Sequence, residues 1–426
     1  MSRRGASHGG APDNGSPRVR WLLRVEPEGL IRDTAVALAA LLFFAILTIW
    51  VRERWALSAL QAGVFLLAVG WSWRLLLRPI PVRFGFPHAV FVAAVFWGLL
   101  QLALGTTVYP HDTWEAVLYW AAALALFFLS SQVLAATETR ARFFRALLYF
   151  GFGVSILSVV QLYTSAGRVF WLFSSGYTDR VMGPFVYHNN YAAFIELLLP
   201  LAFVECLRDR RRTVLFALIA GVMYASVIAS TSRSGAILVT LEVVVLGVLA
   251  SVRRFLSLRR ASMALVLLPV FAAVFTTVFG WRVVWERLQQ PDPYVHRREI
   301  LLSTLDMARE RPGLGFGLGT FPTAYPAYAI FDIGLFVNHA HNDWAEWLAE
   351  GGIPFLLLML SVAFWVVRPA FRSLWGVGIL IVFAHAHVDY PMQRLGLAAW
   401  VFVLMGALDA WAREARSPEG RRRLSL

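Results

Sequence analysis

The sequence contains little charge, one cysteine and no lysine. Only 15% of its 426 residues are charged and 58% are hydrophobic, with a mean hydropathy of +0.62, values outside the usual range of soluble globular proteins. The single cysteine, Cys206, excludes an intramolecular disulfide framework and a metal site built from several thiolates. The composition therefore indicates an integral membrane protein.

Because lysine is absent, all 39 basic residues are arginines, and the formal net charge is +13. These arginines occur singly and in small clusters between apolar runs and form no basic stripe on a soluble domain, so we expect no nucleic-acid partner. Residues 1–33 are polar, and no short apolar core with a small-residue cleavage site follows them. We interpret them as a cytoplasmic tail and not as a signal peptide.

The apolar runs predict an all-α, polytopic membrane protein with about 12 transmembrane helices. Each run is long enough to cross a hydrocarbon core of about 30 Å as a helix. The runs lie near residues 34–51, 56–77, 87–107, 115–136, 144–165, 191–207, 213–231, 235–252, 262–280, 352–368, 373–388 and 395–412. The expected parts of the chain are a polar tail (1–33), N-terminal transmembrane helices (34–180), a second transmembrane region (181–412) and a basic tail (413–426).

The arginines also predict how the chain is oriented. With the N-terminus inside, the inside segments hold 27 of the 39 arginines, as expected of cytoplasmic loops. Both termini are then cytoplasmic, and the long loop 281–341 lies outside. Within this loop, residues 299–311 place apolar side chains on one helical face, which predicts an amphipathic helix along the membrane interface. Pro312 should end this helix.

Several arginines on the predicted outer side could bind an anion. Arg233 lies in the polar break STSRSG (230–235) between two spans, where a guanidinium is costly unless it meets an anion or lines a polar cavity. The alternative is that it reaches out to the lipid headgroups. Arg297 and Arg298 precede the amphipathic segment, and their planar groups suit contact with phosphate oxygens, although a solvated pair is equally compatible. Arg180 is a further candidate for substrate binding.

The segment HAHNDWAEWLAEGGIP (339–354) places ionisable side chains at the mouth of an apolar helix. His341 is predicted to be a general base, because a neutral imidazole can accept a proton at physiological pH. The alternative is a structural histidine beside an apolar helix. The other residues predicted to bind substrate on the same side are Asn189, His339, Asn342 and Asp389.

A second element, HAHVDY (385–390), nearly repeats the first. Its histidines and Asp389 could ligate a divalent metal together with His339 and His341, since imidazole and carboxylate suit zinc or manganese. However, no HExxH-type spacing is present, and we predict no metal site. Asp389 is expected to orient a histidine or to close a loop.

The order of these clusters resembles the O-antigen ligase superfamily of bacterial membrane glycosyltransferases over roughly residues 180–410. The SRSG box, Arg297 before RPGLGFG, HND before an apolar helix, and DYPM occur in family order. In the family motif that begins at the outer histidine, His341, Asn342 and Gly352 match. Phe355 stands where the family has Gly, Thr or Tyr. Where the family often has Asn-x-Asn, this chain has the tripeptide 187–189, Tyr-His-Asn.

The resemblance implies an inverting, metal-independent glycosyltransferase of the bacterial inner membrane that needs no cofactor. It implies transfer of a glycan from an undecaprenyl diphosphate-linked donor to lipid A-core or another glycan acceptor on the periplasmic face. Arg233 and Arg297 would neutralise the diphosphate leaving group, and His341 would deprotonate the acceptor hydroxyl.

Other functions remain open from the sequence. An O-antigen or exopolysaccharide polymerase would use another lipid-linked repeat unit as acceptor, and a protein O-oligosaccharyltransferase is a further option. A transporter is the non-enzyme alternative and predicts charged residues near mid-span. Glu196 and Glu242 are the chief mid-helix carboxylates, too few to indicate a proton relay across twelve spans.

Overall fold

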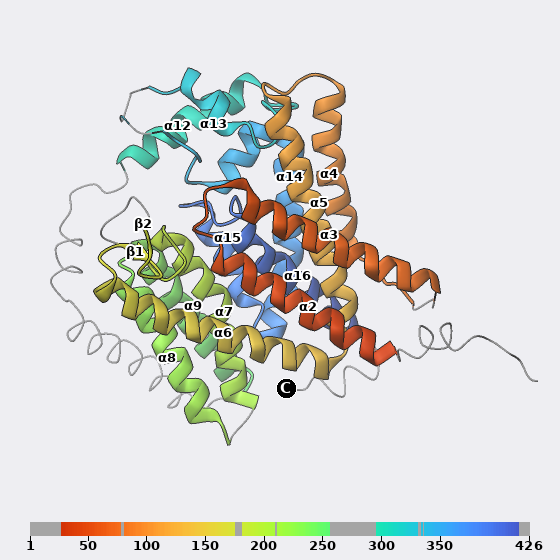
Figure 1. The fold of residues 1–426 in the computed structure, drawn as a ribbon, viewed down its shortest axis with the longest axis vertical. Helices are drawn as coiled ribbons and strands as arrows, with labels where there is room; N and C mark the ends of the chain where they lie inside the picture. The colour runs from red at the N-terminus through yellow and green to blue at the C-terminus, as the bar shows by residue number, and fades with distance from the viewer. Residues whose placement is uncertain are drawn as a thin grey trace, which may run out of the picture.

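The computed structural model describes residues 27–416 except for 78–80, 175–180, 209–210, 256–294, 331–333 and 335. Within these residues the chain is almost entirely helical, and its strands form one two-stranded antiparallel sheet of β1 (Arg168–Val169) and β2 (Phe173–Ser174). The described residues include nine helices long and apolar enough to cross a membrane. The chain is therefore an all-α, multi-pass membrane protein (Figure 1).

The elements follow the predicted order closely. The nine long helices are α2 (Pro27–Leu47), α3 (Arg54–Leu77), α4 (Phe86–Ala103), α5 (Pro110–Val133), α6 (Thr137–Thr164), α7 (His188–Arg208), α9 (Arg233–Val252), α14 (Asp343–Ser373) and α16 (Leu395–Arg416). The shorter ones are α8 (Thr213–Ala229), α12 (Val295–Glu310), α13 (Phe321–Ala324), the 3-10 helix η1 (Tyr325–Ala327) and α15 (Val377–His385). The span predicted at 262–280 lies outside the described residues. The described part thus holds nine long spans where about 12 were predicted for the whole chain.

The apolar run 373–388 forms only the 9-residue helix α15. At about 1.5 Å per residue this helix is roughly 14 Å long, less than half of a bilayer core. α15 packs against α7, α9 and α14, and most of its residues are buried, although His387 and Val388 in the turn that follows are exposed. Irregular backbone at membrane depth is tolerated in such surroundings. Burial among other helices, and not contact with lipid, explains why this run is apolar.

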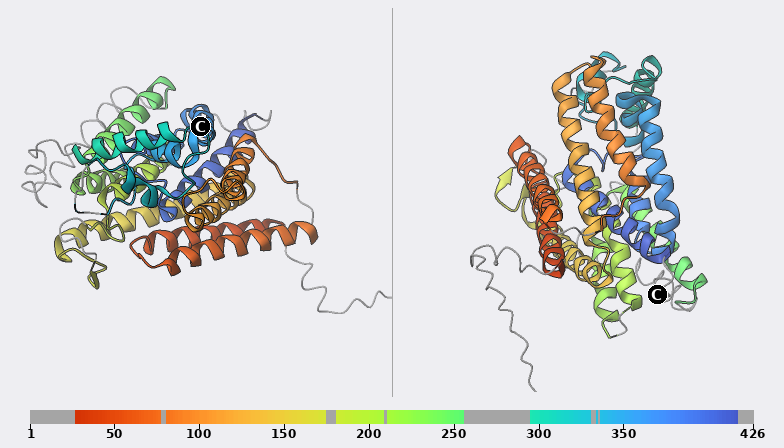
Figure 2. Two further views of the ribbon diagram at one scale, coloured as in Figure 1. Left: turned by 90° about the horizontal axis from the view of Figure 1, so that it is seen from above. Right: turned by 90° about the vertical axis from the view of Figure 1, so that its right-hand side faces the viewer.

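Two helices form the centre of the bundle. In α16 and α7, 89% and 78% of the most apolar stretch is buried inside the protein, so other parts of the chain cover both helices on nearly every side. Gly406 lets α16 approach α5 closely, because a Cβ there would lie 2.5 Å from the carbonyl oxygen of Phe127. By contrast, α2 and α3 lie side by side on the outside of the bundle (Figure 2), and α3 exposes Leu66 and Leu76.

α14 contains a sharp break at Gly352, where the backbone has φ 70° and ψ −176°. The positive φ favours glycine, which has no Cβ to clash. A Cβ at this position would also lie 2.5 Å from the carbonyl oxygen of Gly313. The amide of the next residue, Ile353, donates a hydrogen bond of 2.8 Å to Pro312 O. Gly352 is therefore where the helix accommodates another segment of the chain.

That segment is RPGLGFGLGT (311–320), which follows α12. It docks on the first half of α14 through hydrogen bonds from Phe316 N to Ala349 O (3.0 Å) and from Gly317 N to Glu350 O (2.9 Å). Gln101 of α4 fixes it from the other side by accepting a hydrogen bond from Leu318 N (3.0 Å). The turn is thereby held in a fixed place on the bundle.

The predicted amphipathic helix is present as α12 and ends two residues before Pro312. It buries Ile300, Met307 and Ala308, whereas Arg309 remains exposed. It packs against α14, and together with α13 it lies at one end of the molecule, at the top of Figure 1. The prediction of a helix here is confirmed; its location at a membrane interface stays a prediction.

Candidate active site

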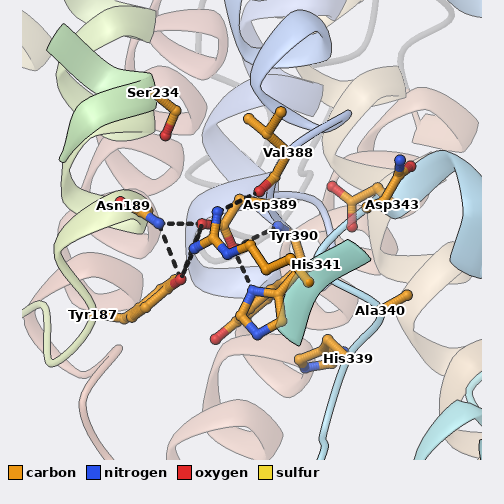
Figure 3. Close-up of polar contacts among 12 residues, drawn as sticks. Tyr187, Asn189, Ser234, His339, Ala340, His341, Asp343, Val388, Asp389 and Tyr390 are labelled. Carbon is orange, nitrogen blue, oxygen red and sulfur yellow. Dashed lines mark hydrogen bonds and ion pairs between the residues drawn. The ribbon is translucent and has the colours of Figure 1, made fainter. Parts of the chain in front are cut away.

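Segments far apart in the sequence meet at one end of the bundle. α7, α9, α12 and α14 all begin there, and the turn after α15 closes the group. The side chains of Tyr187, Asn189, His341 and Asp389 point toward one another in this region (Figure 3). Their polar contacts define a network centred on a single carboxylate.

That carboxylate is Asp389, which is 1% exposed. Its Oδ1 lies 3.3 Å from Nδ1 of His341, whose side chain is 25% exposed. With a proton on Nδ1, the imidazole donates to Asp389, and Nε2 becomes the nitrogen that can accept a proton. This is the arrangement in which a carboxylate fixes the tautomer of a general base.

The backbone at His341 also has a left-handed conformation, with φ 52°. Such a φ is uncommon for residues other than glycine and occurs where surrounding contacts enforce it. Here the next residue, Asn342, caps α14 by accepting from Ala345 N (3.0 Å) and donates to His387 O (2.9 Å). Asp343 N in turn donates to Ala386 O (2.8 Å). Asn342, predicted to bind substrate, thus uses both of its amide groups to join α14 to the turn after α15.

Arg297 of α12 is held by the same carboxylate. Its Nη2 donates to Asp389 Oδ2 (3.3 Å) and to Tyr187 Oη (2.6 Å), and its Nη1 donates to Val388 O (2.7 Å). Burial alone would raise the pKa of Asp389, but the hydrogen bond with His341 and the charge of Arg297 outweigh it and lower that pKa below its ordinary value. Asp389 is therefore an anion between an arginine and a histidine.

Asn189 connects this network to the STSRSG break. Its Nδ2 donates to Asp389 Oδ2 and to Tyr187 Oη (2.9 Å), and its Oδ1 accepts from Ser232 Oγ (2.7 Å). Ser232 also caps α9 by accepting from Gly235 N (3.0 Å). The chain of hydrogen bonds runs through Ser232, and Arg233 follows it as the first residue of α9.

His339 lies next to the network but is engaged elsewhere. Its Nδ1 is 3.0 Å from Glu346 Oε1, and its ring lies 4.5 Å from that of Tyr390. Burial lowers the pKa of His339, and the charges of Arg394 and His341 lower it further, so the ring is neutral near pH 7. Substrate binding by His339 stays a prediction.

A second histidine–carboxylate pair lies deeper. His385 Nδ1 is 2.8 Å from Glu196 Oε2, both side chains are fully buried, and His385 Nε2 lies 3.3 Å from Ser234 Oγ. The sequence considered His385 only as a possible metal ligand and Glu196 as an isolated carboxylate. Among the residues that the structure describes, no group of three or more His, Cys, Asp or Glu side chains is placed to hold a metal.

The structure thus brings Asn189, Arg297, His341 and Asp389 into direct contact. Arg298 is exposed on α12, and Arg180 lies outside the described residues. Sequence reasoning missed Tyr187, which bonds to both Arg297 and Asp389. The sequence feature that could have indicated Tyr187 is its position two residues before Asn189, where the superfamily often has the first Asn of Asn-x-Asn.

Part of the chain matches a known protein family. Residues 214–360, less than half of the chain, match the family model described as O-antigen ligase, which confirms the resemblance in the sequence motifs. This stretch contains Arg233, Arg297 and His341 but ends before Asp389 and begins after Asn189. No curated protein matches the chain.

Proposed function

We propose that this chain, O-antigen ligase-like over residues 214–360, transfers a glycan from an undecaprenyl diphosphate-linked donor to an acceptor hydroxyl. The observation that carries the proposal is the contact of His341 and Arg297 with the two oxygens of one buried carboxylate, Asp389. A base and a cation suited to phosphate are thereby fixed beside each other. The preferred acceptor is lipid A-core, as in ligation of O-antigen.

His341 is the proposed general base. Its Nε2 takes the proton of the acceptor hydroxyl while the hydroxyl oxygen attacks the anomeric carbon of the donor sugar. The bond from that carbon to the diphosphate oxygen breaks, and its electron pair stays on the leaving undecaprenyl diphosphate. Asp389 stabilises the imidazolium that forms. A single displacement of this kind inverts the configuration at the anomeric carbon.

Arginines are proposed to stabilise the leaving group. Charge on the diphosphate increases as the glycosidic bond breaks, so fixed cations lower the energy of the transition state more than that of the bound substrate. Arg297 is positioned for this by its contact with Asp389, and Arg233 would act from the start of α9. Arg298 and Arg180 are proposed to bind the donor. The diphosphate is itself an activated leaving group, so the proposed step requires neither a metal nor a cofactor.

The proposed location is the periplasmic face of the bacterial inner membrane. The support is the excess of arginines in the segments predicted to be cytoplasmic, together with the start of α7, α9 and α14 at the opposite end. With this orientation both termini are cytoplasmic, and the network around Asp389 meets lipid-linked substrates outside.

The test is transfer by the purified protein of a glycan from undecaprenyl diphosphate to lipid A-core, with a second donor molecule offered separately as acceptor. We expect His341→Ala to reduce kcat about 10²- to 10⁴-fold, the usual contribution of a general base. His387→Gln is the matched control, because the His387 ring contacts the Phe383 carbonyl oxygen and the Trp344 ring and has no described contact with Asp389, and it should retain activity.

The outcomes separate the possible functions. Transfer to lipid A-core that depends on His341 establishes ligation, whereas growth on the second donor molecule would identify a polymerase. Full activity of His341→Ala with either acceptor would contradict the proposed base. Folded protein that transfers to neither acceptor would contradict the proposed reaction.

A further inference from the structure

A second polar region lies at the opposite ends of the helices that carry the candidate site. α7, α9 and α14 begin beside Asp389 and end at Arg208, Val252 and Ser373. Between these ends, the start of α6 and the last turns of α16 is a cavity of about 570 Å³. α7 has 21 residues, so the two regions are about 30 Å apart. The cavity is therefore separate from the candidate active site.

The lining of this cavity is strongly basic. Arg140, Arg208, Arg253 and Arg372 contribute four guanidinium groups, and Glu205 is the single carboxylate among the described residues that line it. The arginines come from four different segments that the sequence predicts to be cytoplasmic. Such a convergence of like charges is unfavourable unless an anion or the protein itself compensates it.

Two of the four arginines have partners within the protein. Arg253 donates to two carbonyl groups at the end of α14, including that of Arg372 (2.9 Å), and Arg140 forms an ion pair of 2.8 Å with Glu414. These contacts stabilise helix ends, where carbonyl groups lack partners within the helix. Arg208 and Arg372, in contrast, have exposed side chains at the border of the cavity. Both line the cavity, so their positive charges can pair with an anion that enters it.

One wall of the cavity is apolar and aromatic. The rings of Phe144 and Trp375 pack with centroids 4.7 Å apart, and Trp375 is buried, so this wall is rigid. Trp411 lines the cavity as well. Aromatic rings beside arginines are typical of the depth at which lipid headgroups meet hydrocarbon. The volume lies in the range of pockets that accept small ligands.

We propose that this cavity binds the phosphodiester headgroup of an anionic membrane lipid. Arg208 and Arg372 pair with the phosphate, for which the planar guanidinium is well suited, and the Phe144–Trp375 wall contacts the glycerol and the first carbons of the acyl chains. Basic pockets between transmembrane helices on the cytoplasmic side bind such headgroups. The cavity would thus hold a structural or regulatory lipid, distinct from the glycan donor.

The test uses the full-length protein in detergent, titrated with phosphatidylglycerol or with phosphatidylcholine of the same acyl chains, and counts bound lipids by native mass spectrometry. We expect wild type to prefer phosphatidylglycerol, and Arg208→Gln/Arg372→Gln to bind it about 30-fold more weakly, at about 1 kcal/mol per arginine. Arg74→Gln/Arg142→Gln removes two exposed arginines of the same predicted side outside the cavity, and should bind as wild type does.

Two further measurements make the result decisive. Competition with inorganic phosphate and with glycerol 3-phosphate distinguishes a lipid from a soluble ligand, and displacement of the lipid by either at equal concentration would overturn the lipid assignment. A photoreactive phosphatidylglycerol should crosslink to wild type near Phe144, Trp375 or Trp411, a readout that does not depend on how a variant folds. Equal binding of both lipids by wild type, equal losses in both double variants, or crosslinks elsewhere would also overturn the proposal.

Discussion

Among single residues, Asp389 contacts the most members of the network. One of its oxygens contacts His341, and the other contacts Arg297, Asn189 and Tyr187. A buried carboxylate with partners of this kind remains charged and fixes their positions. Loss of its charge should therefore affect both His341, the proposed base, and Arg297.

The substitution Asp389→Asn tests this. An amide preserves the shape of the side chain but removes the charge that stabilises an imidazolium, and we expect kcat to fall roughly 10²- to 10⁴-fold. KM for the donor should also rise, because Arg297 loses its anchoring charge. Steady-state kinetics on the purified variant measure both effects, with a melting curve to verify folding. A variant with wild-type kcat would remove Asp389 from the proposed mechanism.

His339 should make stability depend on pH. Its pKa is lower in the folded protein than the ordinary value of about 6.5, so the unfolded chain binds more protons in the interval between the two values. Stability is then retained above about pH 6.5 and decreases as the pH falls, by at most about 1.4 kcal/mol per pH unit. Melting temperatures between pH 5 and 8 should show a weaker slope for His339→Gln than for wild type and His387→Gln. Parallel curves for all three proteins would contradict this origin.

At the level of helices, the break in α14 positions the residues on both of its sides. Gly352 admits the backbone of the 311–320 segment against the helix, and the part of α14 before the break holds Asn342 and the residues that fix His341. The glycine that the superfamily motif shares thus has a physical reason in the close approach of two backbones.

Gly352→Ala should destabilise the protein. The backbone of Gly352 lies in a region that essentially only glycine populates, so a residue with a Cβ costs about 1–3 kcal/mol there, and the 2.5 Å approach to Gly313 O adds a steric clash. Gly153→Ala is the matched control, because a Cβ at that position in α6 meets no atom within 4 Å; it should be neutral or stabilising by up to about 1 kcal/mol. Thermal unfolding in detergent compares the two variants. Equal melting temperatures would contradict a structural need for glycine at the break.

For the whole molecule, hydropathy predicts most of the helices, and the helical periodicity of apolar residues predicts the amphipathic segment now seen as α12. Hydropathy overestimates the length of α15, because an apolar run that is buried among other helices has the same composition as one that faces lipid. Motif order predicts the candidate site residues individually. Asp389 was expected to orient a histidine, and it contacts His341. Which histidine it contacts could not be predicted, since His341 and Asp389 are brought together only by the way α14 and α15 pack. The contact between Glu196 and His385 could not be predicted either, because the two residues are 189 positions apart in the sequence.

The position of Asp389 beyond the matched stretch has a consequence for building chimeras. Exchange of residues 214–360 with a relative would transplant His341 and Arg297 but leave their common partner Asp389, together with Tyr187 and Asn189, in the recipient chain. The donated His341, the proposed base, would then rely on a carboxylate that belongs to another protein. Boundaries that enclose the chain from before Tyr187 to the start of α16 would keep these five residues together. A swap designed on the matched stretch alone would test the compatibility of two half-sites, not the specificity of a complete enzyme.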